Sequence, residues 1–500
     1  MIKNRIGNQF DYKWLFAILI AILPRLVRLV YAYAWFEDSA YLYHAFAFKS
    51  GLKPFLDTIC VHPPTLEYLL AGLYNIFGVS YRVAEILSAI VVSISTILLF
   101  DISQKIFDKY IALFVTGIFS LSSLLFRYHI FEREVFTLSI SVLILWIISR
   151  GRSTPYNALL IGVLVGIGFG IKFSGLFILP PVILFLLFTR QYKTILFTTL
   201  GFFVTSLIIY GYFLLSYKET AYNQLFLFHF FKGYNATITI RFLNTFVRDL
   251  NYLWIFGGGG LILSLLISNR ILIFPIIIFI EYTIFFLFVS STCWPHNMID
   301  LLLPLSLGNG VTFHYLKLFF IESKRKIAKI FLIGVSIFVF IILGSLRQDY
   351  YQGFGYLPRN ELVKAAEFVR SNTSEKMPIH APHYLANEAQ RLKIVDYEEL
   401  IGPYRLIESL REKKDYTTIE TLKSVHWYDL IEITLPLWRD ELNNAIMERR
   451  ISCAVWDKVF PEWSLIYDID RRLEDELKLF SNAGYEIKYN SPVYTIWLAK

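Results

Sequence analysis

Two adjacent acids and a histidine-proline turn form the first candidate site in this chain. Glu37 and Asp38 follow directly after a long apolar run, and His62-Pro63-Pro64 comes about 25 residues later. A carboxylate at a membrane surface can accept the proton of an attacking hydroxyl, and a histidine can donate a hydrogen bond to a phosphate. The bland alternative is that the acids are the solvated end of a helix and that His62 is an ordinary loop residue.

Several basic residues could hold an anion near the acid pair. Lys172 lies at a bend between two apolar runs, and Lys232 and Arg241 lie in a long segment interleaved with aromatic residues. Arg25 and Arg28 belong to the apolar run that precedes the acids. Lys and Arg stay protonated and can reach phosphate oxygens. Alternatively, Lys172 is a structural lysine whose stem lies along lipid, and the aromatic residues form an interfacial belt.

Further acids lie at or inside the later apolar runs. Glu134 begins the fourth run and Glu281 lies in the middle of the ninth, where a carboxylate usually signals function or a buried partner. No role for Glu281 emerges from its position. The cavity that would hold the phosphate could also be lined by His296, Asn297 and Asp300. Structural hydrogen bonding is the simpler interpretation of these three residues.

The elements that must position these residues are membrane helices. Of the 500 residues, 56% are hydrophobic and only 18% are charged, with a mean hydropathy of +0.51. A helix that crosses a bilayer needs about 20 mostly apolar residues. The sequence therefore predicts a polytopic α-helical membrane protein with about eleven spans, near 14–34, 82–100, 110–126, 134–149, 157–171, 174–189, 194–216, 251–268, 271–290, 298–318 and 328–346.

The charge distribution predicts how the chain is oriented. Lys and Arg number 15 in 49 residues in one set of connecting segments, against 9 in 97 residues in the other. Cytoplasmic segments carry the excess of Lys and Arg. We therefore expect a multi-pass plasma-membrane protein with a cytoplasmic N-terminus and a first outer loop at 35–81. The formal net charge of +8 is then a topology signal and requires no nucleic-acid partner.

The composition changes after residue 346. Residues 347–500 hold 21 Lys and Arg and 25 Asp and Glu. A helical pattern at 359–371 alternates with short apolar segments at 393–395, 453–456 and 493–498, which is typical of an α/β fold. We expect a transmembrane catalytic domain at 1–346 and a soluble extracytoplasmic α/β domain at 347–500.

A glycine-rich run leads up to Lys172. Gly162, Gly166 and Gly170 are four residues apart, so they share one face of the expected helix. Small residues on one face let two membrane helices pack closely. Packing is therefore the main expected reason for these glycines, and they locate Lys172 at the end of a helix.

Taken together, these motifs resemble those of the GT-C glycosyltransferases. The acid pair and the later H-P-P turn are similar to the first outer loop of the protein O-mannosyltransferase and aminoarabinose-transferase branch. The run from Gly162 to Lys172 looks like that family's glycine-rich helix ending on a lysine at the lipid-facing site. Glu134 stands where the family keeps an acid in its second outer loop.

One departure concerns the order of the acids. The family often reads Asp-Glu where this chain reads Glu37-Asp38. Either acid could therefore be the base. The spacing of Tyr41 and Tyr43 after Asp38 resembles related enzymes and favours Asp38.

The resemblance implies a glycosyltransferase with a polyprenyl (dolichyl)-phosphate sugar donor and a protein or lipid/glycan acceptor on the outer face. Asp38, with Glu37, would serve as the base, and Glu134 would position the acceptor or hold a divalent ion with Asp38. The donor phosphate would be bound by His62, Lys172, Lys232, Arg241 and Arg28. No nucleotide cofactor is expected, because the outer face has no nucleotide pool, and metal use stays open.

The alternative function is a membrane transporter or lipid flippase without glycosyl transfer. Transporters usually consist of paired halves with interrupted helices, and the sequence shows no such symmetry. A non-catalytic scaffold that displays the C-terminal domain is a third interpretation. The enzyme interpretation predicts that Asp38, His62, Glu134 and Lys172 converge on one cavity at the outer surface.

Overall fold

The structure is a computed structural model of the 500-residue chain. It describes residues 12–30, 34–35, 39–125, 131–151, 154–227, 253–266, 269–288, 295–323, 356–357, 359–394, 435–458 and 473–499. The chain divides into two compact units. The first consists of Met1–Tyr31, Ile86–Ser206 and Tyr234–Tyr350, and the second of Ala32–Glu85, Leu207–Gly233 and Tyr351–Lys500. The predicted boundary at 346–347 lies outside the described residues.

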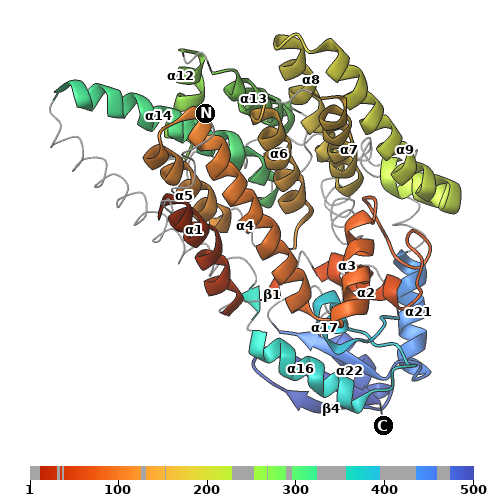
Figure 1. The fold of residues 1–500 in the computed structure, drawn as a ribbon. Coiled ribbons are helices and arrows are strands. Elements are labelled where there is room, and N and C mark those ends of the chain that lie inside the picture. The colour runs from red at the N-terminus through yellow and green to blue at the C-terminus, as the bar shows by residue number, and fades with distance from the viewer. Residues whose placement is uncertain are drawn as a thin grey trace, which may run out of the picture. The chain divides into compact units, whose positions relative to one another are not determined.

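The first unit is made of apolar helices, because Ile-, Leu- and Phe-rich runs in lipid can satisfy their backbone groups only internally. Figure 1 shows the helices in chain order. They are α1 (Tyr12–Val30), most of α4 (Tyr81–Ile106), α5 (Lys109–Leu125), α6 (Arg133–Ser149), α7 (Pro155–Ile171), α8 (Leu179–Phe188), the first half of α9 (Tyr192–Tyr222), α12 (Gly259–Leu263), α13 (Ile273–Phe288) and α14 (Leu302–Ser323).

In the described part of the chain, helical segments lie within each of the predicted spans from 14–34 to 298–318, although Ala34 already belongs to a strand. The last predicted span, 328–346, lies outside the described residues, so the count of eleven stays a prediction. By length and composition alone, two helices in the described part of the chain could cross a membrane, Tyr81–Ile106 and Tyr192–Phe226. Shorter apolar helices include Pro155–Ile171 and Phe173–Phe188.

α7 and α9 approach each other closely along the predicted glycine face. A Cβ atom at Gly162 would lie 2.0 Å from the carbonyl oxygen of Thr198. A Cβ atom at Gly166 would lie 2.6 Å from the Cβ atom of Thr205. The structure therefore confirms that Gly162 and Gly166 make a packing seam, which holds α7, the helix that ends before Lys172, against α9.

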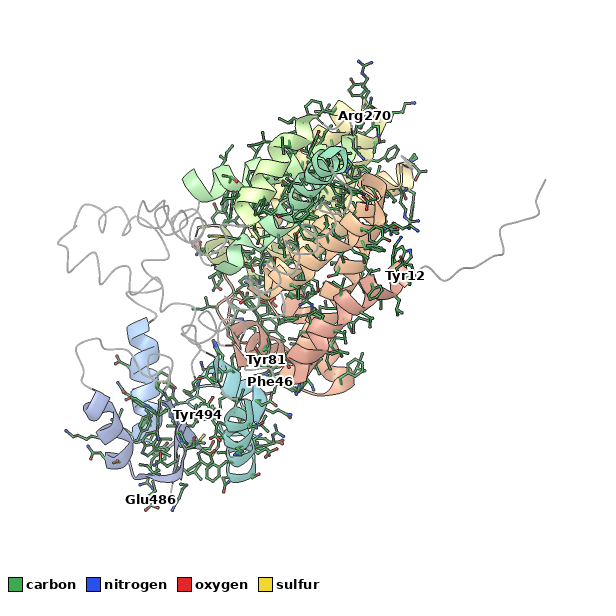
Figure 2. The ribbon with its side chains drawn as sticks, turned by 90° about the vertical axis from the view of Figure 1, so that its left-hand side faces the viewer. Tyr12, Phe46, Tyr81, Arg270, Glu486 and Tyr494 are labelled. Carbon is green, nitrogen blue, oxygen red and sulfur yellow. The ribbon has the colours of Figure 1, made fainter. Side chains whose placement is uncertain are left out.

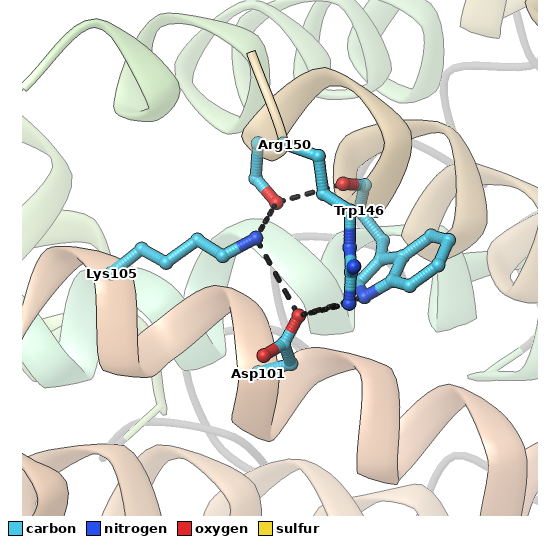
Figure 3. A network of polar contacts seen from close by, with 5 residues as sticks. Asp101, Lys105, Trp146 and Arg150 are labelled. Carbon is cyan, nitrogen blue, oxygen red and sulfur yellow. Dashed lines mark hydrogen bonds and ion pairs between the residues drawn. The ribbon is translucent and has the colours of Figure 1, made fainter. Parts of the chain in front are cut away.

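A network of polar contacts joins α4 to the end of α6 (Figure 3). Asp101 accepts a hydrogen bond from Nε1 of Trp146 at 2.8 Å and pairs with Arg150 at 3.3 Å and Lys105 at 3.5 Å. The Arg150 guanidinium also lies 4.1 Å from the centroid of the Trp146 ring. A single exposed ion pair contributes little to the free energy of unfolding. The structural effect of this network is that one carboxylate links α4 to the end of α6.

The second unit contains the segment predicted as the first outer loop, within Ala32–Glu85, and the C-terminal segment, Tyr351–Lys500. The loop forms the short strand β1 (Ala34–Trp35), α2 (Ser39–Lys49) and α3 (Thr65–Phe77). α3 begins directly after Pro63-Pro64, since proline cannot donate to the preceding turn and is tolerated at a helix start. β1 pairs antiparallel with β2 (Tyr356–Leu357), with Ala34 opposite Leu357 and Trp35 opposite Tyr356.

The C-terminal segment packs helices against a small sheet. Its helices are α16 (Arg359–Asn372), α17 (His383–Ala389), α21 (Leu435–Met447) and α22 (Leu473–Asn482). The sheet has the spatial order β3 (Cys453–Asp457), β5 (Tyr494–Ala499) and β4 (Tyr485–Asn490), and neighbouring strands are antiparallel. Isolated parallel bridges, Ile379 to Lys393 and His380 to Ala454, extend the pattern beyond β3.

The core of this segment is aromatic and aliphatic. Phe480 of α22 stacks on Trp497 of β5 with ring centroids 5.6 Å apart, and Ile446 of α21 is fully buried in the same cluster. In Figure 2 the labelled Tyr494 and Glu486 mark β5 and β4. Tyr494 is buried, whereas Glu486 pairs with Lys488 on the surface.

Candidate active site

A buried ion pair joins two helix ends in the first unit. Glu134 lies in the first turn of α6, where its side chain is 2% exposed, and Lys172 is the residue that caps the C-terminal end of α7. The Lys172 ammonium donates a hydrogen bond to Oε1 of Glu134. A helix N-terminus stabilises negative charge and a C-terminus stabilises positive charge, so both residues occupy favourable ends. The fold thus brings together two residues that the sequence singled out separately.

Asp300 joins this pair from a third segment, η6 (Pro295–Leu301). It is 3% exposed, and its Oδ1 accepts a hydrogen bond from Oγ1 of Thr137 at 3.1 Å. Tyr282 of α13, Glu134 and Lys172 also interact with it electrostatically. Among the described residues, Oδ2 of Asp300 has no hydrogen-bond partner. We refer to Glu134, Thr137, Lys172, Tyr282 and Asp300 as the Lys172 cluster.

The Lys172 cluster contains one cation for two buried carboxylates. Buried carboxylates need hydrogen-bond donors or cations beside them, and here these include the Lys172 ammonium and the Thr137 hydroxyl. In the described part of the chain, no three His, Cys, Asp or Glu side chains come together as a metal site. Glu134 and Asp300 would therefore offer a divalent ion two oxygen donors, and further ligands would have to come from substrate or from elsewhere in the chain.

Asp300 is the member of the cluster whose importance the sequence did not reveal. The sequence indicates it only as a possible cavity residue, beside His296 and Asn297. Its hydrogen bond with Thr137 is of the structural kind that the sequence favoured. The available signal was an acid at the start of an apolar run, and no motif distinguishes such an acid from a solvated helix end.

The turn after Lys172 is packed tightly on α7. The N–H of Gly175 donates to the carbonyl of Lys172 at 2.8 Å, and the Tyr282 hydroxyl donates to the carbonyl of Ser174 at 3.2 Å. A Cβ atom at Gly175 would lie 2.2 Å from the carbonyl carbon and oxygen of Gly168. This close approach fixes the direction in which the chain leaves α7, and therefore the place of the Lys172 ammonium.

Gly175→Ala is expected to displace Lys172 and to lower about tenfold the rate of the glycosyl transfer that the sequence motifs predict. The added methyl group meets backbone atoms that cannot move aside, and overpacking of this kind costs about 1–3 kcal/mol. Initial rates and thermal unfolding in detergent check the prediction. Gly259→Ala in α12 is the matched control, because nothing lies within 4 Å of the added Cβ atom. Equal rates for the two variants would contradict the positioning role of Gly175.

The loop that carries His62 is held by η2 (Asn223–Leu227), the helical turn that follows α9, within the second unit. Oε1 of Gln224 accepts a hydrogen bond from the N–H of Cys60 at 2.9 Å, and its Nε2 donates to the carbonyl of Phe55 at 3.0 Å. One buried amide side chain therefore fastens two points of the loop directly before His62. His62 itself lies in a bend that leads into the Pro63-Pro64 start of α3.

Aromatic side chains of α2, α3 and α9 pack together next to the loop that carries His62. Tyr68 of α3 stacks on Phe48 of α2 at 5.1 Å between ring centroids and on Phe213 of α9 at 6.3 Å. Burial, together with the neighbouring Tyr217 hydroxyl, raises the pKa of Tyr68 above its usual range. The phenol therefore remains a neutral hydrogen-bond donor at any physiological pH.

The remaining predicted catalytic and binding residues are placed as follows. Arg28 lies in α1, with its side chain outside the described part. The residues that lie wholly outside the described part are Glu37, Asp38, Lys232 and Arg241. His62 belongs to the second unit, whereas Glu134 and Lys172 belong to the first. The convergence of Asp38, His62, Glu134 and Lys172 on one cavity stays a prediction.

Arg25, one helical turn before Arg28, anchors α1 to α5. It is 2% exposed, and its Nη2 donates to the carbonyl of Ser120 at 2.7 Å and to the Ser120 hydroxyl at 3.3 Å. The Ser120 hydroxyl in turn donates to the carbonyl of Ile20 at 2.6 Å. These bonds give Arg25 a structural role between two helices.

Comparison with a family model and with solved structures shows what the chain is similar to. The model described as dolichyl-phosphate-mannose-protein mannosyltransferase matches residues 61–217, a stretch that contains His62, Glu134 and Lys172. No curated protein matches this chain.

Solved structures of two kinds share the fold. ArnT from Cupriavidus metallidurans bound to undecaprenyl phosphate is 11% identical, with a TM-score of 0.66 over 97% of this chain and 98% of that chain. The Archaeoglobus fulgidus oligosaccharyltransferase in complex with Zn and sulfate is 15% identical, with a TM-score of 0.52 over 77% of this chain and 62% of that chain. AglB from Archaeoglobus fulgidus, in complex with an inhibitory peptide and a dolichol-phosphate, is 15% identical, with a TM-score of 0.50 over 77% of this chain and 64% of that chain.

These matches confirm the resemblance to the GT-C glycosyltransferases that the sequence motifs predicted. They also show that the chain has the helical membrane fold of that group. The matched stretch begins at the H-P-P turn and ends in α9, so it contains the Glu134 and Lys172 positions but neither Asp300 nor the acid pair.

Proposed function

We propose that this membrane protein of the GT-C fold is a glycosyltransferase that moves one sugar from a polyprenyl-phosphate carrier to a protein or lipid/glycan acceptor on the outer face. The observation that carries the proposal is the buried Glu134–Lys172 pair, which lies inside the stretch matched by the mannosyltransferase model. ArnT, which shares the fold, is bound to undecaprenyl phosphate in its structure, and AglB is in complex with a dolichol-phosphate.

In the proposed reaction the acceptor nucleophile attacks the anomeric carbon while Asp38 takes its proton. The bond between that carbon and the lipid phosphate breaks, and the phosphate leaves with the electron pair. Attack from the side opposite the leaving group inverts the configuration of the sugar. Glu37 assists by its charge, and no nucleotide takes part, because the lipid phosphate is the leaving group.

Lys172 is proposed to stabilise the negative charge that develops on the departing phosphate, with Lys232, Arg241, Arg28 and His62 as further donors. A preorganised ammonium in a water-poor site acts strongly on a developing charge. Glu134 lies against that ammonium. We therefore assign Glu134 the task of holding Lys172 in place, and contact with acceptor or a divalent ion would come second.

The proposal includes the topology predicted from the charge distribution. The protein lies in the plasma membrane with a cytoplasmic N-terminus. Residues 1–346 form the membrane domain, and residues 347–500 form an extracytoplasmic α/β domain. In support, the described part of 347–500 holds helices and an antiparallel sheet that share a core of aromatic and aliphatic side chains.

The test is a transfer assay on the purified full chain in lipid nanodiscs. A panel of polyprenyl-phosphate sugars with labelled sugar is offered together with peptide and lipid acceptors. One donor is expected to lose its label to an acceptor, with an equal amount of polyprenyl phosphate released. A donor that crosses the bilayer in proteoliposomes with its label still attached would support the flippase alternative instead.

A further inference from the structure

The C-terminal segment contacts the first outer loop on both sides of the acid pair. On the N-terminal side, β1 (Ala34–Trp35) forms its antiparallel pair with β2 (Tyr356–Leu357). On the C-terminal side, α2 begins at Ser39, directly after Asp38, and packs on α17. All of these segments belong to the second compact unit.

The contact between α2 and α17 centres on Tyr43, which is 1% exposed. Its hydroxyl accepts a hydrogen bond from the backbone N–H of Lys393 at 2.9 Å. Its ring stacks on His383 of α17 with centroids 4.8 Å apart and planes inclined by 16°, and the Lys393 ammonium lies 5.7 Å from the ring centroid. His44, the next residue of α2, also meets His383, edge to face at 5.8 Å.

The far end of the loop is held by the same part of the C-terminal segment. Oε2 of Glu388 accepts a hydrogen bond from the N–H of Tyr81 at 3.1 Å, and Nε2 of Gln390 donates to the carbonyl of Val79 at 3.3 Å. Figure 2 labels Tyr81 together with Phe46 of α2, which lie in the loop that these contacts hold. Polar side chains of residues 388–390 therefore fasten the point where α3 gives way to α4.

We infer that the C-terminal segment positions the acid pair for catalysis, with Tyr43 as the positioning residue that transmits its hold. Only residues 36–38 separate β1 from α2, and three residues span at most about 11 Å. The C-terminal segment therefore holds both elements that flank the acid pair, β1 through its pairing with β2 and α2 through its packing on α17. Misplacement of a reacting group by about 1 Å can cost about 100-fold in rate, so such a hold affects catalysis directly. This inference rests on the proposed function, since it assumes that Asp38 is the base.

The decisive variant is Tyr43→Phe, with Tyr485→Phe as its matched control. Both changes remove one hydroxyl from a buried tyrosine of the same unit. The Tyr43 hydroxyl binds the N–H of Lys393, whereas the Tyr485 hydroxyl donates to the carbonyl of Ile451 at 2.9 Å inside the C-terminal segment. Tyr43→Phe is expected to lower kcat about tenfold with the KM for donor changed less than about twofold, while Tyr485→Phe leaves both within about twofold.

A second comparison separates positioning from a general loss of structure. If Tyr43 acts through Asp38, adding Tyr43→Phe to an Asp38→Asn enzyme is expected to change the residual rate less than about twofold, because coupled residues are not additive. Independent, multiplicative losses would overturn the inference. So would equal losses of kcat in Tyr43→Phe and Tyr485→Phe at a temperature where both are folded.

Hydrogen exchange tests the hold without relying on activity. Amides of residues 39–49 are expected to exchange faster in Tyr43→Phe than in wild type, with no change there in Tyr485→Phe. Unchanged exchange in Tyr43→Phe would overturn the inference even if the enzyme is active. If the wild-type chain transfers no sugar from any donor, but Tyr43→Phe still speeds exchange at residues 39–49, the proposed function is overturned and the contact between the C-terminal segment and the loop stands.

Discussion

Replacing Asp38 by Asn is expected to lower the rate of sugar transfer about 10²–10⁴-fold, the contribution that a positioned general base makes. The amide keeps the size of the carboxylate but cannot take the proton of the attacking acceptor. Binding of the donor should change little, because Asp38 is not among the groups proposed to contact the lipid phosphate. Initial rates with a labelled polyprenyl-phosphate sugar, together with donor binding by calorimetry, measure the two effects.

Glu37→Gln is the matched control for that variant. The two acids are adjacent in the chain, so a general effect of removing one negative charge should appear in both. We expect the Glu37→Gln rate to stay within about tenfold of wild type, below the range for loss of the base. The opposite pattern, with Glu37→Gln inactive and Asp38→Asn active, would assign the base to Glu37.

Lys172→Met is expected to cause the second large loss, in both stability and transfer. It leaves the Glu134 carboxylate, 2% exposed, without its ammonium partner. Removing one partner of a buried ion pair costs about 3–5 kcal/mol, so the melting temperature in detergent should fall clearly. Transfer should fall at least about 10²-fold, because the developing phosphate charge also loses its ammonium.

The double variant Lys172→Met with Glu134→Gln separates these two effects. With neither charge buried alone, most of the stability should return. Transfer should stay at least about 10²-fold below wild type if Lys172 serves the phosphate. Recovery of transfer together with stability would reduce Lys172 to a structural counter-ion of Glu134.

The pair of Lys317 with Asp108 supplies the control for charge removal in the same unit. Both side chains are about one-third exposed, at 33% and 34%. Lys317→Met should therefore cost no more than about 1 kcal/mol. Burial acts to raise the pKa of Asp108, but the Lys317 ammonium and the N–H groups of Ile111 and Tyr110 outweigh it and lower that pKa. Because about a third of the Asp108 side chain is exposed, water can hydrate the carboxylate when Lys317 is removed.

Local features of the sequence were enough to predict the helical membrane class and several positions within it. An apolar run of sufficient length predicts a membrane helix whatever it packs against, because in lipid the backbone must form its hydrogen bonds within the segment. The glycine spacing at Gly162 and Gly166 likewise predicted a close helix contact, since four-residue spacing puts small residues on one face. Glu134 and Lys172 could be singled out because they stand at the ends of apolar runs and match motifs of the GT-C glycosyltransferases.

Tertiary structure alone decided which of these residues meet. Glu134 and Lys172 are 38 positions apart and Thr137 and Asp300 are 163 apart, and neither hydropathy nor helical periodicity carries information over such separations. The contact of Tyr43 with Lys393 spans 350 positions. Composition predicted that residues 347–500 fold differently from the membrane part. Only the tertiary structure shows that buried hydrogen-bonding groups of this segment pair with the loop that carries the acids. Such pairs form because a buried polar group must find a partner wherever the packed chain offers one.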